Sequence, residues 1–482
     1  MDYGVVRKVV GSVLKITAGL MLIPLCLSLF WREFSVSAAF MWSALITFAV
    51  GTALGASQAD YKSIRIREAL LIVTLVWISV SICGALPYLF AGAITTIPDA
   101  LFESTSGFTT TGATVIDDVE SLPRGILFWR SLTLWIGGMG ILVLYLTVLP
   151  ALGVSGQQIY KAELPGPVAD KIAPKLADTA RILYVVYGGM TAVLTILLMF
   201  GGLAFFDALQ FAFATVSSGG FSIYNSSITK FNSNTFVLIT ISVFMILSGV
   251  NFSLYYDLRK RRFKSVFQNT ELRLYGALLL LATAAVMLNL YQNVFESLFE
   301  AFKHALVQVS SIITTNGFAS ANFDQWPDFS KLILFFLMFT GASAGSTTGA
   351  IKLFRVVIAG KVIKREISQL FHPRAVIPVT MNGRMVSKET IRGVCAFLFL
   401  YLAVFAASTL ILSLEGIGMA SAASTSAAVL GNGGAGFGVV APIHTYSQFS
   451  PAATLFLTFL MLLGRLELFT LIAIITPSYW KQ

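Results

Sequence analysis

Ten stretches of this chain are apolar over enough positions to cross a membrane as helices. The hydrocarbon core of a bilayer is about 30 Å thick, and a helix needs about 20 apolar residues to cross it. Stretches of about that length cover residues 9–30, 38–54, 69–90, 126–149, 182–200, 236–256, 274–291, 332–359, 395–414 and 453–475. The pattern predicts an all-α polytopic membrane protein. The composition agrees, because 56% of the residues are hydrophobic and only 12% are charged.

The last eight stretches form four pairs, and a shorter semi-polar segment lies between the members of each pair. These segments, 99–114, 207–222, 301–320 and 421–438, end in Thr, Ser, Asn and Gly. A helix of about 11 residues rises only about 16 Å, so each segment can enter a membrane and return but cannot cross it. We therefore expect two N-terminal helices followed by four repeats around a pseudo-fourfold pore, each repeat being a helix, a re-entrant pore loop and a second helix.

These repeats divide the chain into five units. A two-helix extension covers residues 1–58, and pore repeats one to four cover 59–160, 161–264, 265–385 and 386–482. Repeat three also contains an irregular glycine-rich segment, 341–349.

Basic residues gather on one side of the predicted spans. Residues 61–68 carry Lys62, Arg65 and Arg67, residues 259–264 are basic except at Phe263, and 361–392 adds seven more. Such loops face the cytoplasm, so the net charge of +10 reflects membrane topology rather than nucleic-acid binding. The opposite side carries a set of acidic residues, namely Asp99, Glu103, Asp117, Asp118, Glu120, Asp324 and Asp328. We expect the re-entrant segments to open from this outer, cation-attracting face.

Non-helical backbone at membrane depth survives only where its carbonyl groups are buried in protein or line a wet cavity. Four such segments around one axis would present rings of oxygens that replace the hydration shell of a cation, as in potassium filters. We call them the filter segments, and the residues expected to bind potassium or shape the backbone are Thr110, Thr111, Gly112, Ser217, Ser218, Gly219, Thr315, Asn316, Gly317, Asn432, Gly433 and Gly434. Close helix packing by small residues is the alternative for any one segment, but it does not explain matching places in four repeats.

Two further irregularities suggest a gate beneath the filter. Residues 341–349, here called the gate loop, include Gly341, Gly345 and Gly349 and form a poor helix. Ala350, Ile351 and Lys352 follow, and Lys352 is counted with the gate. In the last stretch Arg465 lies at membrane depth, where a charge usually faces a pore or a partner. The alternatives are a flexible packing kink for the gate loop and a structural ion pair of Arg465 with Glu467.

Other functional classes have little support. Cys26, Cys83 and Cys395 are far apart inside apolar stretches, and the three histidines lack metal-ligand spacing. The glycines of 434–438 lack the strand and helix of a dinucleotide site. We therefore expect no enzyme activity, no bound metal besides potassium as substrate, and no covalent cofactor.

Several strings of the sequence resemble the Trk/Ktr/HKT potassium transporters. They are TTTGAT at 109–114, WRSLTLWIGGMG at 129–140, AELPGPV at 162–168, GGFS at 219–222, HPRAV at 372–376 and LGRLELFT at 463–470. The resemblance implies a homodimer in the bacterial inner membrane, each protomer with its own pore. It also implies a cytosolic, RCK-type nucleotide-binding regulatory subunit on the basic face, and a gate loop that Arg465 approaches. Asn432 is followed by Gly-Gly-Ala-Gly, where the family usually has an aliphatic residue, Gly, Pro and Gly.

The expected function is gated, channel-like potassium uptake driven by the membrane potential. One alternative is a symporter that couples potassium to sodium or protons, but such transporters usually bury carboxylates at the midplane, and here the deep carboxylate is essentially Glu467. Another alternative is the potassium-translocating subunit of an ATP-driven pump, which the family strings disfavour.

Overall fold

The computed structural model describes residues 1–56, 65–140, 176–442 and 444–481. Six of the described helices are each long and apolar enough to cross a membrane, and two bent helix pairs bring the number to eight. The predicted all-α membrane fold is confirmed. The lysine at 62, the string 162–168, the second part of the stretch 126–149 and the boundary at 160 lie outside the described residues.

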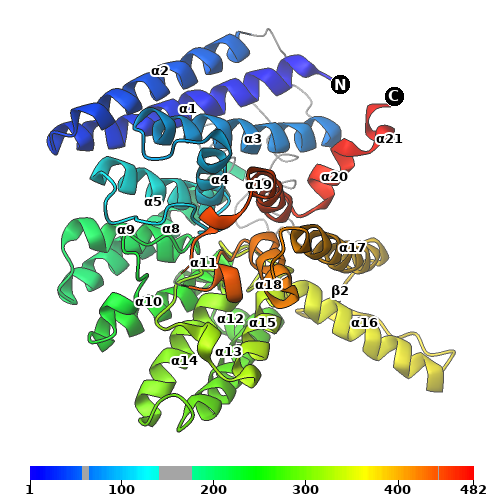
Figure 1. Ribbon diagram of the computed structural model, residues 1–482. Coiled ribbons are helices and arrows are strands. Elements are labelled where there is room, and N and C mark those ends of the chain that lie inside the picture. The colour runs from blue at the N-terminus through cyan, green and yellow to red at the C-terminus, as the bar shows by residue number, and fades with distance from the viewer. Residues whose placement is uncertain (57–64, 141–175, 443, 482) are drawn as a thin grey trace.

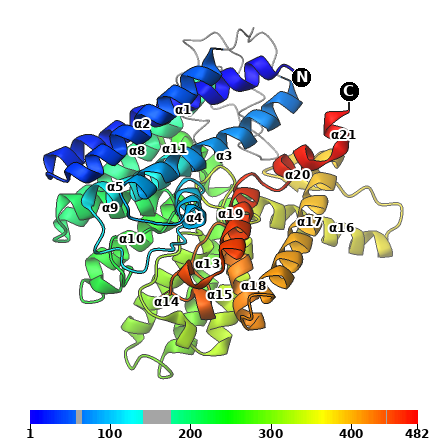
Figure 2. The same ribbon diagram turned by 45° about the horizontal axis from the view of Figure 1, so that its top comes forward.

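The N-terminal extension is a helical hairpin of α1 (Tyr3–Phe30) and α2 (Phe34–Gly55). The two helices touch at Gly11, where an added Cβ would lie 2.5 Å from the carbonyl oxygen of Gly51. Figures 1 and 2 show this hairpin lying across α3, at the edge of the molecule.

Each of the four repeats contains a long helix, a short pore helix and a second short helix. Repeat one has α3 (Ile66–Phe90), α4 (Ile97–Phe108) and α5 (Arg124–Gly138), and repeat two has α8 (Leu176–Phe200), α9 (Phe205–Val216) and α10 (Thr235–Ser248). Repeat three has α13 (Thr270–Leu290), α14 (Leu298–Ile313) and α15 (Asp328–Thr340), and repeat four has α17 (Lys388–Ser413), α18 (Met419–Leu430) and α19 (Pro451–Arg465).

The remaining elements lie between these helices or after the last of them. They are α11 (Phe252–Arg259), α12 (Phe263–Phe267), α16 (Leu353–Phe371), α20 (Phe469–Ile475) and α21 (Pro477–Trp480), with 3₁₀ turns at Thr229–Phe231, Phe323–Gln325, Gly438–Val440 and Tyr446–Gln448. Strands β1 (Thr380–Met381) and β2 (Arg384–Met385) form an antiparallel hairpin after α16. In Figure 1, α16 projects away from the body of the molecule.

The second helix of each repeat packs on the pore helix of the next repeat. The contacts run from α5 to α9, from α10 to α14, from α15 to α18, and from α19 back to α4. This closed circuit, visible around the centre of Figure 1, brings the C-terminal ends of the four pore helices together.

Local sequence explains where the pore helices begin. In repeat one the Thr96 hydroxyl accepts a hydrogen bond from the amide of Asp99 at 3.2 Å, and Pro98 follows in the first turn. Such a cap satisfies an amide that has no partner within the helix. The predicted re-entrant segments are therefore pore helices, each beginning two or three residues before its predicted start.

Three of the predicted spans are not continuous. The expected break within 332–359 is present, since α15 ends at Thr340 and α16 begins at Leu353. The predictions of unbroken spans at 236–256 and 453–475 are wrong, because α10 and α11 meet at 92° and α19 and α20 at 115°. At the second bend, Glu467 and Leu468 have φ angles of 52° and 55°, which a right-handed helix cannot contain.

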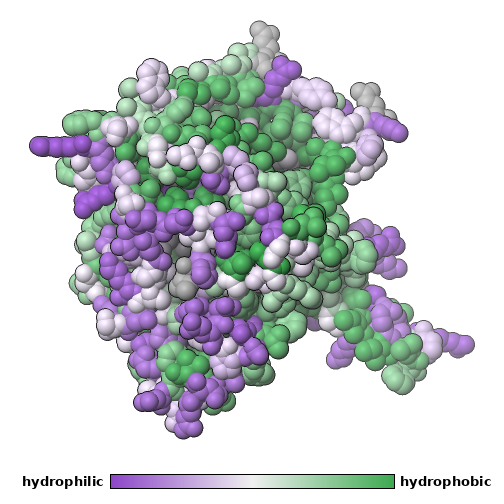
Figure 3. Space-filling view, viewed as in Figure 1, coloured by the Kyte–Doolittle hydropathy of each residue, from purple (hydrophilic) through white to green (hydrophobic). Residues whose placement is uncertain are grey.

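Figure 3 shows how polarity is distributed over one face of the molecule. Hydrophobic residues cover the region of α1 and α2, and hydrophilic residues gather over the loops around α9, α10 and α14. This is the division expected between a lipid-facing surface and a wet loop region.

Candidate functional site

The four filter segments share one backbone conformation. In each, a residue other than glycine directly follows the capping residue of the pore helix and has a left-handed φ: 56° at Thr110, 57° at Ser218, 54° at Thr315 and 53° at Asn432. Such conformations typically require about 1–3 kcal/mol of strain per residue. The same strain at four matching places indicates that the surrounding structure imposes it.

The ends of the pore helices explain this conformation. The amide of the residue after each left-handed position donates to the carbonyl five residues earlier, as between Thr111 and Ser106 at 2.9 Å and between Asn316 and Ser311 at 2.8 Å. Gly219 and Gly433 make the corresponding bonds at 2.9 and 2.7 Å. This is a Schellman-type helix end, which turns the chain sharply away from the helix axis.

A second left-handed position follows two residues later and is glycine in every repeat. The φ angles are 74° at Gly112, 70° at Gly220, 84° at Gly317 and 65° at Gly434. The predicted ring of equivalent glycines is therefore corrected in repeat two, where Gly220 takes the place assigned to Gly219. Ser218, rather than Ser217, correspondingly matches Thr110.

These four glycines close a ring of contacts between neighbouring segments. A Cβ added to Gly112 would lie 2.0 Å from the carbonyl oxygen of Gly219, and one on Gly220 would lie 1.7 Å from that of Asn316. The ring continues from Gly317 to the oxygen of Gly433 at 2.7 Å, and from Gly434 back to that of Thr111 at 2.2 Å. Each glycine thus lies against the carbonyl that directly precedes the glycine of the next segment.

The predicted hydroxyl and amide groups of the filter tie the segments together. Asn432 Nδ2 donates to Thr111 Oγ1 at 3.0 Å, and Asn316 Nδ2 donates to the carbonyl oxygens of Ala214 and Thr215 at 3.2 and 3.3 Å. Ser217 Oγ instead donates within segment two, to Ala214 O at 3.2 Å. The buried Oδ1 atoms of Asn316 and Asn432 have no hydrogen-bond partner among the described residues, so they remain available as acceptors.

One cavity of about 140 Å³ opens onto the ring from the loop side. Its lining includes Gly112, Gly220, Gly317 and Gly434, together with Asp117. Close to it, Asn225 Nδ2 donates to Asp118 at 2.9 Å and lowers the pKa of that carboxyl, which keeps it ionised. This face of the ring therefore carries the negative charge of Asp117 beside the cation of Arg130, which also lines the cavity.

Glu103 does not belong to this outer surface, contrary to the sequence prediction. Its side chain is fully buried and lies 2.8 Å from Arg130 Nε. Residues 27 positions apart in the chain form this pair, and their local sequence does not reveal it.

The gate loop packs against the filter segments. Ser218 Oγ lies 2.8 Å from Thr347 Oγ1, and the amide of Gly349 donates to Thr315 Oγ1 at 3.0 Å. A Cβ on Gly349 would lie 2.2 Å from the carbonyl oxygen of Gly431. The loop thus contacts segments two, three and four.

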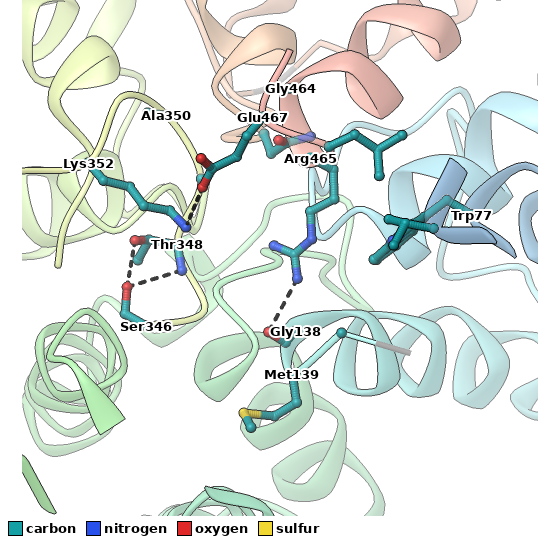
Figure 4. Close-up of a pocket in the computed structure, with 15 residues that line it drawn as sticks. Trp77, Gly138, Met139, Ser346, Thr348, Ala350, Lys352, Gly464, Arg465 and Glu467 are labelled. Carbon is teal, nitrogen blue, oxygen red and sulfur yellow. Dashed lines mark hydrogen bonds and ion pairs between the residues drawn. The ribbon is translucent and has the colours of Figure 1, made fainter. Parts of the chain in front are cut away.

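Arg465 reaches the same loop from α19. Its Nη1 atom donates to the carbonyl oxygen of Thr347 and to Thr110 Oγ1, each at 3.3 Å, and Nη2 donates to the carbonyl oxygen of Gly138 at 3.2 Å. Figure 4 shows the guanidinium between Trp77 and Gly138. The predicted approach of this cation to the gate loop is therefore present in the structure.

Glu467 joins the two cations that follow the gate loop. Lys352 Nζ lies 3.1 Å from its Oε1 atom (Figure 4), and Arg355 hydrogen-bonds its Oε2 atom. The sequence indicated Lys352 but not Arg355, which lies one helical turn further along α16.

A second carboxylate holds the gate loop, and sequence reasoning missed it. Glu271, buried in the first turn of α13, accepts hydrogen bonds through Oε1 from the amides of Ala344 at 2.7 Å and Phe354 at 3.1 Å. One oxygen atom thus connects the beginning of the loop to the beginning of α16. An acidic residue at a helix N-terminus usually serves as a cap, so the sequence offered no reason to single it out.

Comparison with known proteins places this arrangement among cation transporters. The model of a family described as TrkH, cation transport protein, matches residues 36–481. The chain is similar to the Trk system potassium uptake protein TrkH of Escherichia coli (strain K12), with 36% identity over 487 residues and 100% of both chains covered. It is also similar to the Trk system potassium uptake protein TrkG of that organism, with 36% identity, 96% of this chain and 95% of the relative covered. The crystal structure of the potassium transporter TrkH from Vibrio parahaemolyticus matches with a TM-score of 0.89 and 32% identity over 100% of both chains.

Proposed function

The chain belongs to the TrkH family of cation transport proteins, and we propose that it lets potassium ions into the bacterial cell through the ring of filter segments. It is a multi-pass protein of the inner membrane. The observation that carries the proposal is the closed ring of glycines at 112, 220, 317 and 434, each against a carbonyl of the next segment. Such a ring can present carbonyl oxygens to a dehydrated cation.

The ligands in this proposal are mainly backbone oxygens. They come from two consecutive residues in each segment, with the register of repeat two corrected: Thr110 and Thr111, Ser218 and Gly219, Thr315 and Asn316, and Asn432 and Gly433. Many of the hydroxyl and amide hydrogens of these residues are committed to neighbouring segments. Their side chains therefore hold the segments in place, while their oxygen lone pairs supplement the carbonyls.

The membrane potential is sufficient to drive uptake through such a pore. About 100 mV supplies about 2.3 kcal/mol per charge, which corresponds to roughly 50-fold accumulation of a monovalent cation. The chain therefore needs no coupled ion, but a permanently open path would dissipate the potential. A closable gate follows from this requirement.

The gate loop is the proposed barrier. Its contacts with Ser218, Thr315 and Arg465 support a closed position under the filter. Lys352 and Arg355, paired with Glu467, hold the chain in place where it leaves the loop and enters α16. Opening requires these contacts to break together, which a partner on the cytoplasmic side could cause.

A cytosolic RCK-type nucleotide-binding subunit is the proposed regulator, and the transporter is proposed to act as a homodimer. The residues Arg259, Lys260, Arg261, Arg262 and Lys264 are exposed and form a basic patch suited to a soluble acidic partner. The patch begins at the last residue of α11, and the amide of Phe252, the first residue of that helix, donates to the carbonyl oxygen of Gly345 at 3.0 Å. A docked partner would therefore contact a short helix that is bonded to the gate loop.

Reconstitution tests the proposed function. Protein in liposomes loaded with potassium is placed in sodium buffer, and uptake of tracer potassium is followed while the membrane potential is set with an ionophore. We expect uptake that follows the potential and needs neither a sodium nor a proton gradient. Uptake that stops when either gradient is removed at constant potential would contradict the channel-like proposal and favour symport.

A further inference from the structure

A buried ion pair lies beside the filter and is not used in the ion path proposed above. Arg130 on α5 and Glu103 on the pore helix α4 are 2% and 0% exposed. Among the ion pairs of the described residues it is the most buried. Burying two charges is unfavourable unless further hydrogen bonds satisfy them, so the remaining partners of both groups show what the pair holds.

The guanidinium of Arg130 uses all three of its nitrogens. Nε pairs with Glu103 at 2.8 Å, Nη2 donates to Thr114 Oγ1 at 3.2 Å, and Nη1 donates to the carbonyl oxygen of Ser222 at 3.1 Å. Its flat face lies 4.2 Å from the centre of the Phe221 ring. The side chain therefore contacts filter segment one and filter segment two at once.

The carboxylate of Glu103 fastens the first of these segments. Its two oxygens lie 3.0 Å from Thr114 Oγ1, and Oε2 also accepts from the amide of Val115 at 3.1 Å. Thr114 thus accepts from Arg130 and donates to Glu103. The chain leaving segment one is fixed by both members of the pair.

The two contacts of Arg130 lie at equivalent positions of their segments. Thr114 is the second residue after Gly112, and Ser222 is the second residue after Gly220. Arg130 therefore spans the contact between segments one and two, where Gly112 lies against the carbonyl of Gly219. We call such a contact between neighbouring segments a seam. A shift of either segment along the pore axis would break at least one of the three bonds.

The other seams of the ring are held by different groups. Asn232 Nδ2 donates to the carbonyl of Ser320 at 3.0 Å between repeats two and three, and Asp324 accepts from the amide of Gly438 at 3.0 Å between repeats three and four. Between four and one, the amide of Tyr446 donates to the carbonyl of Thr114 at 2.8 Å. Within the described residues, the Arg130 seam is thus the one joined by a buried ion pair.

We propose that Arg130 and Glu103 are positioning residues that set ion selectivity by holding filter segments one and two in register. Arg130 lines the cavity outside the ring, and the pair acts on the ring through Thr114 and Ser222. The proposal rests on the proposed filter function. Because the three hydrogen-bond partners lie around one planar guanidinium group, this role requires the shape of an arginine side chain and not only its positive charge.

The charge-conserving variant Arg130→Lys tests this requirement. Lysine has a single nitrogen, which cannot reach Glu103, Thr114 and Ser222 together. We expect Arg130→Lys to lower the potassium-to-sodium permeability ratio about tenfold, the effect of losing one hydrogen bond to a charged group. The ratio is measured from reversal potentials in planar bilayers with potassium on one side and sodium on the other.

Two further variants keep the test decisive. Arg124→Lys is the matched control, because Arg124 lies in the first turn of the same helix, is exposed, and has its guanidinium 5.7 Å from the Trp31 ring. The permeability ratio of this variant should equal that of wild type. Thr114→Val removes the hydroxyl shared by the pair at nearly constant volume, and it should lower the ratio even if Arg130→Lys fails to fold.

The outcomes separate this proposal from the proposed function. If wild-type protein discriminates between potassium and sodium while Arg130→Lys and Thr114→Val, recovered as monodisperse protein, keep its reversal potential, the positioning role is overturned and the filter stands. If wild-type protein does not discriminate between the two ions, the filter proposal itself fails.

Discussion

Arg465, the last residue of α19, donates a hydrogen bond to the carbonyl oxygen of Thr347, with 3.3 Å between Nη1 and the oxygen. The same nitrogen reaches Thr110 in filter segment one. A single cation therefore connects repeat four, the gate loop of repeat three and the filter of repeat one. We therefore expect it both to hold the loop and to oppose a potassium ion arriving below the filter.

Removing this cation should open the pore. In Arg465→Ala the bonds to Thr347 and Thr110 are lost, and we expect the open probability to rise roughly tenfold, since hydrogen bonds to charged groups contribute about 1.5–3 kcal/mol each. Single-channel recording measures this change. The reversal potential should stay near the wild-type value, because the contacts between the four glycines and the neighbouring carbonyls do not involve Arg465. An unchanged open probability would assign Arg465 a purely structural role.

Glu271 should be a second residue that stabilises the closed position of the gate loop. Glu271→Ala removes the oxygen that accepts from Ala344 and Phe354, so basal potassium flux without a regulator should increase. Glu271→Gln keeps an acceptor oxygen at nearly the same place and should lie between alanine and wild type. Flux into liposomes provides the comparison. Equal flux in all three proteins would show that these two bonds do not control the loop.

The cluster of Glu467, Lys352 and Arg355 should matter for stability as well as for gating. Glu467→Gln leaves two largely buried cations without their counter-charge, and breaking a buried pair in this way typically destabilises a protein by about 3–5 kcal/mol. A lower Tm in detergent should result. Adding Lys352→Met should restore part of the loss, because one of the two orphaned charges is then removed. A double variant less stable than Glu467→Gln would argue against pairing.

The basic patch at 259–264 should bind the regulatory subunit. Replacing Lys260 and Arg261 with glutamine should weaken binding of an RCK-type subunit, and the difference from wild type should shrink as salt rises, because exposed charges are screened within about 8–10 Å. Pull-down at several salt concentrations measures this. Replacement of Lys364 and Arg365 on α16 serves as a charge-matched control. If neither the patch variant nor the control variant weakens binding, the docking surface lies elsewhere.

The fold could be predicted from the sequence because apolar length and its fourfold recurrence are local properties. The two bends were missed for a physical reason. Glu467 and Leu468 favour helix by composition, yet they take left-handed φ angles beside Gly464, whose added Cβ would lie 2.2 Å from the carbonyl of Leu430. Contacts between helices, rather than intrinsic propensity, end α19 at this point.

The candidate site was predicted to the level of segments but not of every residue. Two adjacent glycines in GGFS leave the register open, and only the backbone φ distinguishes Gly220 from Gly219. Arg130 with Glu103, and Glu271 with the gate loop, are joined across 27 and 73 or more positions. No periodicity in a single sequence connects groups so far apart, so these contacts required the folded structure.

The central claim, that the ring of four glycines selects the ion, is tested most directly by the reversal potentials of two neighbouring variants. Gly220→Ser places a side chain at a φ of 70° and against the carbonyl of Asn316, whereas the nearest atoms to a Cβ at Gly219 belong to the side chain of Leu134, the first at 2.4 Å. We predict that Gly220→Ser moves the reversal potential strongly toward that of a nonselective pore, and that Gly219→Ser moves it much less. Wild-type reversal potentials in a well-expressed Gly220→Ser protein, or a larger shift in Gly219→Ser, would contradict the account.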